Sequence, residues 1–138
     1  MARQRWLEIA AIFAALGGAL WLVKLGFVAA ASGGENAAIA TCYLGGWAFM
    51  CVGSTWAGTR LALHRPVVVL AILVLLSPLL VFVSYTLIDA LAQPSLGQLG
   101  PAWFEAEAGI IVTGLIWLLL GLAALRWSRL GRSRVGQT

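Results

Sequence analysis

The sequence predicts an all-α membrane protein, a single domain of 138 residues folded as an antiparallel bundle of four transmembrane helices. Hydrophobic residues make up 62% of the chain and charged residues 10%. A soluble domain of this size buries too little of its surface to hide so much apolar area. Four apolar runs also reach the length of about 20 residues that crosses a bilayer. Backbone polar groups cannot go unpaired in hydrocarbon, so each run is expected to be a helix.

The four predicted helices are separated by short segments rich in turn-forming residues. Ser32, Gly33 and Gly34 end the first run, and Pro66 suits the first turn of the third. The longest loop is marked by Pro94, Gly97, Gly100 and Pro101. Ser77-Pro78 lies in the middle of the third run and predicts a kink. The expected spans are about 6–30, 36–59, 66–91 and 102–127, followed by a basic tail at 128–138.

The basic residues lie almost entirely on one side of this pattern. Cytoplasmic loops collect Lys and Arg, so the bias predicts that both termini face the cytoplasm. We therefore expect a multi-pass protein of the cytoplasmic membrane, and the Arg-, Ala-, Gly- and Leu-rich composition is typical of a GC-rich bacterial genome. The opposite side has Glu35, Glu105 and Glu107. The eight basic residues of the inner side are Arg3, Arg5, Arg60, Arg65, Arg126, Arg129, Arg132 and Arg134.

A cleaved signal peptide is the alternative interpretation of the N-terminal run. Arg3 and Arg5 form a basic start, and the small residues at 29–31 resemble a cleavage site. The apolar stretch between them is too long for a signal peptide and contains Lys24. An uncleaved first helix is therefore favoured.

Ionisable residues inside membrane helices are the first candidates for function. Lys24 lies in the outer part of the first run, and an acidic partner would lower the cost of placing it there. Asp89, near the outer end of the third run, and Glu35, in the first outer loop, are the predicted partners. Lys24, Asp89 and Glu35 thus form the candidate polar site, although a lysine that reaches the interface or is paired, and only orients the bundle, is the favoured alternative. Contacts with cytoplasmic lipid headgroups are predicted for Arg60, Arg65, Arg126 and Arg129.

No catalytic, cofactor-binding or metal-ligating motif is present in the sequence, and no cofactor is expected. The basic residues do not form a soluble face, so nucleic acid is not an expected partner. Small residues spaced four apart, such as Ala14 and Gly18 or Gly53 and Ala57, favour close helix packing or a homo-oligomer. We expect a non-enzymatic accessory or packing subunit that contacts the lipid bilayer and a membrane-protein partner. The alternative is a small oligomeric transporter or channel with its polar site at the outer ends of the first and third helices.

Overall fold

The computed structural model describes the backbone of residues 2–62 and 64–135 and the side chains of residues 3–62, 64–96 and 98–128. These residues form four long helices, α1 (Ala2–Ala30), α2 (Ala37–Leu61), α3 (Val67–Leu96) and α4 (Ala102–Val135), and a short 3₁₀ helix, η1 (Gly97–Leu99). All four long helices are of sufficient length and apolarity to cross a membrane. The predicted all-helical fold with four such helices is therefore confirmed.

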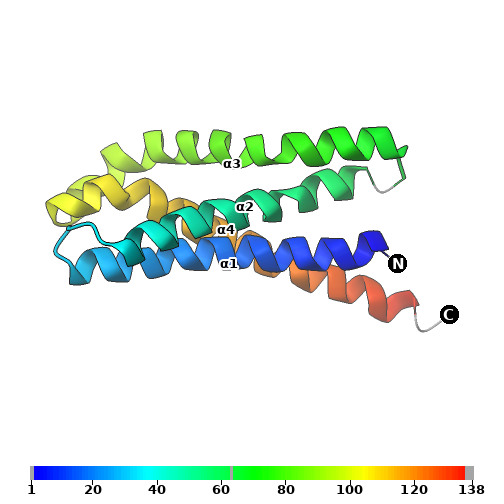
Figure 1. The fold of residues 1–138 in the computed structure, drawn as a ribbon, viewed down its shortest axis with the longest axis horizontal. Coiled ribbons are helices and arrows are strands. Elements are labelled where there is room, and N and C mark those ends of the chain that lie inside the picture. The colour runs from blue at the N-terminus through cyan, green and yellow to red at the C-terminus, as the bar shows by residue number, and fades with distance from the viewer. Residues whose placement is uncertain (1, 63, 136–138) are drawn as a thin grey trace.

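The helices form an elongated bundle in which each runs antiparallel to the next (Figure 1). The beginning of α1 and the last turns of α4 lie at one end, together with the α2–α3 connection, and we call this the terminal end. The α1–α2 and α3–α4 connections lie at the opposite, distal end. Contacts are most extensive between α1 and α2 and between α1 and α4, whereas α3 contacts α2 and α4 less extensively. Helices α1 and α3 thus occupy diagonal positions.

Glycines bring the three tightly packed helices together. A Cβ atom added at Gly18 of α1 would collide with the backbone of Gly114 and Leu118 in α4. A Cβ atom added at Gly53 of α2 would lie 2.5 Å from the Cα atom of Ala14 in α1. Small residues allow membrane helices to approach this closely, and van der Waals packing between them then holds the helices.

The core of the bundle is aromatic and lies in its distal half. The ring of Trp21 is fully buried and stacks on Tyr43, with the ring centroids 5.7 Å apart. Trp47 and Tyr85 meet the same indole edge to face at 5.2 Å and 5.4 Å. The Trp21 indole N–H donates to the carbonyl oxygen of Tyr43 at 3.1 Å, so this large buried side chain has its polar atom satisfied.

Helix α3 differs from its neighbours in being mostly exposed. Only 11% of its most apolar stretch is buried, against 39% for α1. Pro78 lies inside it and cannot donate to the carbonyl of Val74. The Ser77 hydroxyl donates to that carbonyl instead, at 2.7 Å. The serine therefore replaces the hydrogen bond that the proline removes, and the helix continues.

Two helices extend beyond their predicted ends. We expected the third helix to stop near residue 91, but α3 continues through Pro94 to Leu96. A proline this close to the end of a helix removes one backbone bond without stopping the last turn. We expected the fourth helix to stop near residue 127, but α4 continues to Val135 because arginine is a good helix former.

Candidate functional site

A buried ion pair joins α1 to α4 in the distal half of the bundle. The Lys24 Nζ atom donates to both carboxylate oxygens of Glu107, each at 2.6 Å. The Lys24 side chain is 7% exposed and that of Glu107 14%. The ammonium group also lies 5.2 Å from the centre of the Tyr43 ring, an arrangement that favours the cation. Two charge-assisted hydrogen bonds and an aromatic face therefore surround this lysine.

The register of α1 and α4 explains why these two residues meet. The helices touch where Gly18 lies against Gly114. Lys24 is six residues beyond the first glycine and Glu107 is seven before the second, so both lie about 9 to 10 Å from the contact at 1.5 Å per residue. Because the helices are antiparallel, both displacements point to the distal end. The glycine contact thus sets the depth at which the two charges pair.

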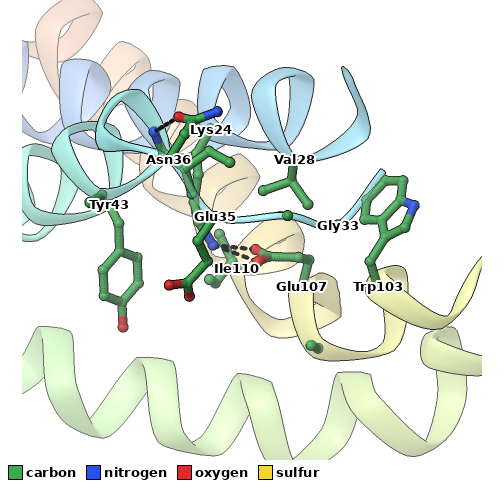
Figure 2. A pocket seen from close by; sticks show the side chains of 13 residues that line it. Lys24, Val28, Gly33, Glu35, Asn36, Tyr43, Trp103, Glu107 and Ile110 are labelled. Atoms are coloured by element: carbon green, nitrogen blue, oxygen red, sulfur yellow. Dashed lines mark hydrogen bonds and ion pairs between the residues drawn. The ribbon is translucent and has the colours of Figure 1, made fainter. Parts of the chain in front are cut away.

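A cavity of about 450 Å³ opens beside the ion pair at the distal end. Figure 2 shows Lys24 from α1, Glu107 from α4 and Glu35 from the α1–α2 connection around the same space. Tyr43 and Trp103 supply aromatic walls. Two carboxylates and one ammonium give this cavity a net negative charge.

The α1–α2 connection is held in a defined shape next to this cavity. Ser32 and Gly33 have φ angles of 51° and 87°, and this left-handed geometry turns the chain after α1. A Cβ atom at Gly33 would lie 3.0 Å from the Cβ atom of Trp103, so the glycine lets the tryptophan of α4 pack on the turn. The side chain of Asn36 accepts from the Ile39 N–H at 3.0 Å and caps α2. The connection therefore forms one wall of the cavity.

The structure does not pair Lys24 with either predicted partner. Asp89 was expected to face Lys24, but it lies on α3, diagonal to α1, where its Oδ2 atom accepts from Gln93 at 3.2 Å. Its Oδ1 atom is buried against Gly109 and has no hydrogen-bond partner among the described residues. Glu35 is exposed and lines the same cavity as Lys24, but the ion pair goes to Glu107. The ion pair expected with Asp89 or Glu35 is therefore formed with Glu107 instead.

Glu107 was missing from the predicted site because it was counted only among the acidic residues of the outer side and was not weighed as a partner of Lys24. Its position along the fourth helix indicated that it could pair with Lys24. Lys24 lies six residues before the end of α1, and Glu107 lies five residues after the start of α4. At 1.5 Å per residue the two residues share nearly the same depth, which is the condition for an ion pair between antiparallel neighbours.

The predicted headgroup contacts lie at the terminal end. Arg60, Arg65 and Arg126 are all exposed there. The Arg60 guanidinium stacks over the ring of Trp127, 5.7 Å from its centre. The side chain of Arg129 lies outside the described residues, as do those of the tail that follows it.

A second cavity, of about 620 Å³, has the opposite chemistry. It lies between α3 and α4 with α1 and α2 behind it, and its walls are almost entirely apolar. Among the residues that the structure describes, no three His, Cys, Asp or Glu side chains gather as a set of metal ligands. Buried hydroxyl side chains lie elsewhere in the bundle as well, but Lys24 is the charged residue among the buried residues that the structure describes.

No family model matches the chain, and neither a curated protein nor a solved structure shows significant similarity to it.

Proposed function

We propose that the chain is a non-enzymatic accessory subunit of the bacterial cytoplasmic membrane. It crosses the bilayer four times with the terminal end in the cytoplasm, and it packs against a partner membrane protein. The basic residues at the terminal end and the acidic residues at the distal end support this orientation.

The main support for the proposal is that the charge of the buried Lys24 is neutralised by Glu107 within the bundle. Both carboxylate oxygens of Glu107 accept from Lys24, so this charge is already satisfied without a bound solute. The polar cavity is confined to the distal half, and the cavity between α3 and α4 is apolar. A single copy with this arrangement suits a stable packing element better than a path for polar solutes.

Orientation is tested with single cysteines at the two ends of the bundle. In a background of Cys42→Ser and Cys51→Ser, we introduce Gln98→Cys at the distal end or His64→Cys at the terminal end. Both positions are exposed. A membrane-impermeant maleimide on intact cells should label the distal cysteine, and the terminal one only after the cytoplasmic side is opened. The reverse pattern would invert the orientation, and equal labelling of both would exclude membrane insertion.

The accessory role is tested by the mass of the complex extracted from the native membrane. Native mass spectrometry in a mild detergent should show the chain in a fixed ratio with a second membrane protein. Leu75 on α3 is 76% exposed and is a suitable position for a photo-crosslinking residue. A product of one defined mass from this position would place the partner on α3. A chain that runs only as a monomer or homo-oligomer would contradict the accessory role.

A small oligomeric transporter or channel is the second candidate, and the distal cavity favours it. The cavity places a buried ion pair beside an opening of about 450 Å³. Ionisable groups at such positions mark solute pathways in many membrane proteins. Purified protein in liposomes should then move an ion or a small solute, and Lys24→Gln should abolish the flux while Arg65→Gln leaves it intact. The absence of flux for a panel of ions and amines would remove this candidate.

A further inference from the structure

We infer that the apolar cavity between α3 and α4 is a binding groove for one acyl chain of an anionic phospholipid, whose headgroup lies at Arg60. The inference rests on the proposed insertion of the bundle with its terminal end in the cytoplasm. It adds a specific ligand that the accessory role does not require.

The walls of the groove select an apolar occupant. Ala57 and Gly121 are among the small residues that line it, and Leu80 and Leu120 are among the aliphatic ones. Its two hydroxyls are already used within their own helices. Ser54 donates to the Cys51 carbonyl at 2.7 Å, and Ser84 donates to the Val81 carbonyl at 3.0 Å. The groove thus offers an occupant apolar surface and no free hydroxyl hydrogen.

The size of the groove fits one lipid chain. Along α4 it extends from Ile116 to Trp127, which is about 16 Å at 1.5 Å per residue. One leaflet of the hydrocarbon core is about 15 Å deep. If a methylene occupies about the volume of a water molecule, roughly 30 Å³, a chain of about 16 carbons fills nearly 500 Å³. The cavity of about 620 Å³ therefore holds one such chain.

A helix from a partner or a second copy is too large for the same space. A helix at least about 10 Å across and about 16 Å long occupies roughly 1,300 Å³. This is about twice the volume of the groove. A neighbouring helix can cover the open side of the groove but enters it only by displacing α3 or α4, whereas the volume of an acyl chain fits inside.

The charge at the mouth of the groove selects an anionic headgroup. Trp127 lines the groove at the terminal end, and the Arg60 guanidinium stacks over its ring. On α2, Arg60 follows the groove residues Trp56 and Ala57 by one turn, so it lies on the same face of the helix. Basic residues at the cytoplasmic side of membrane helices bind anionic lipid headgroups. A phosphate at Arg60 would place the acyl chain in line with the groove.

The inference is tested by native mass spectrometry of the full chain, exchanged into mixed micelles of phosphatidylglycerol and phosphatidylcholine with identical acyl chains. We expect one retained phosphatidylglycerol per chain. The preference over phosphatidylcholine should be about fivefold. One arginine beside an anionic headgroup contributes about 1 kcal/mol, which corresponds to this ratio of affinities. Arg60→Gln should abolish this preference, and Arg65→Gln, equally exposed but away from the groove, should preserve it. Equal retention of both lipids, or equal effects of the two variants, would overturn the inference.

A second pair of variants tests the groove itself. Ala57→Leu enlarges a small residue of the groove lining and should abolish lipid retention, whereas Ala48→Leu on the exposed face of the same helix should not. If Ala57→Leu does not fold, a second measurement takes the place of this variant. Phosphatidylglycerol with brominated acyl chains quenches the fluorescence of tryptophans that it contacts. Trp127→Phe should then remove more of the quenching than Trp6→Phe, which lies at the terminal end outside the groove. Lipid retention by Ala57→Leu, or equal losses for the two tryptophans, would contradict the groove. If the spectrum shows a dimer that only Ala57→Leu removes, the occupant of the groove is a second copy of the chain and not a lipid.

The outcome is separate from that of the proposed function. The cysteine labelling above tests insertion and orientation without any lipid preference. Correct labelling with no retained phosphatidylglycerol would overturn the groove alone, and inverted labelling would overturn the orientation on which the inference rests.

Discussion

The distal half of the bundle and its terminal half are held together by different means. In the distal half, Lys24 and Glu107 pair between α1 and α4, and the ring of Trp21 contacts rings from α2 and α3. From the middle of the bundle toward the terminal end, an apolar cavity lies between α3 and α4 and reaches Trp127. Lipid tails are as apolar as leucine, so aliphatic side chains alone give membrane helices little reason to associate. At the terminal end α3 still approaches α2, where a Cβ atom at Gly58 would lie 2.5 Å from the carbonyl oxygen of Leu73, so the difference lies in the means of contact between α3 and α4.

The ion pair provides the strongest test of this difference. Glu107→Gln leaves the buried Lys24 ammonium without its counter-charge, and breaking one side of a buried pair costs about 3–5 kcal/mol. We expect a loss of this size in the free energy of unfolding, measured by denaturant titration in detergent. Replacing both partners in Lys24→Leu/Glu107→Leu should restore most of the stability, because no unpaired charge remains. A single variant as stable as the parent would mean that the pair does not hold the distal half.

The glycine contact between α1 and α4 gives the next largest effect. Gly18→Ala places a methyl group against the backbone of Gly114, and overpacking of this kind costs about 1–3 kcal/mol. Gly26 is the matched control on the same helix, because a Cβ atom there has open space around it. Gly26→Ala should be neutral or should stabilise by up to about 1 kcal/mol through its higher helix propensity. Thermal unfolding of both variants in the same detergent makes the comparison, and equal losses would contradict the close approach.

The smallest effect is expected on the exposed face of α3. Leu75 is 76% exposed, and in a membrane it contacts lipid in both the folded and the separated states. Leu75→Ala should change stability by no more than about 0.5 kcal/mol. Val81 on the same helix is fully buried in the aromatic core, so Val81→Ala should cost measurably more. Equal losses would show that α3 packs as tightly as its neighbours.

The four helices could be predicted because the sequence contains long segments without charge. Pro66 and the Ser32–Gly34 turn also gave boundaries within a few residues. The end of α3 was less predictable, because Pro94 is typical of a loop but is tolerated in a last helical turn. Local sequence determines where a helix forms more directly than where it stops.

The partner of Lys24 could not be predicted from the residues nearest to it along the chain. Glu107 is 83 residues away, and the pairing depends on which helices are neighbours in space. The diagonal position of α3 relative to α1 removes Asp89 from reach of Lys24, and nothing in the four apolar runs sets this order. The Gly18–Gly114 contact that fixes the register is equally invisible when each helix is considered alone.

The long separation of Lys24 and Glu107 has a consequence for biosynthesis in the proposed membrane. At about 5–20 residues per second, the ribosome adds the 83 residues between them in roughly 4–17 s. During that time α1 emerges with a lysine whose counter-charge has not yet been made, at a cost of up to about 3 kcal/mol for entering the bilayer centre. In the proposed membrane, α1 therefore remains without the counter-charge of Lys24 until the first turns of α4 have been synthesised. Synthesis of α4 is then the step that neutralises this lysine.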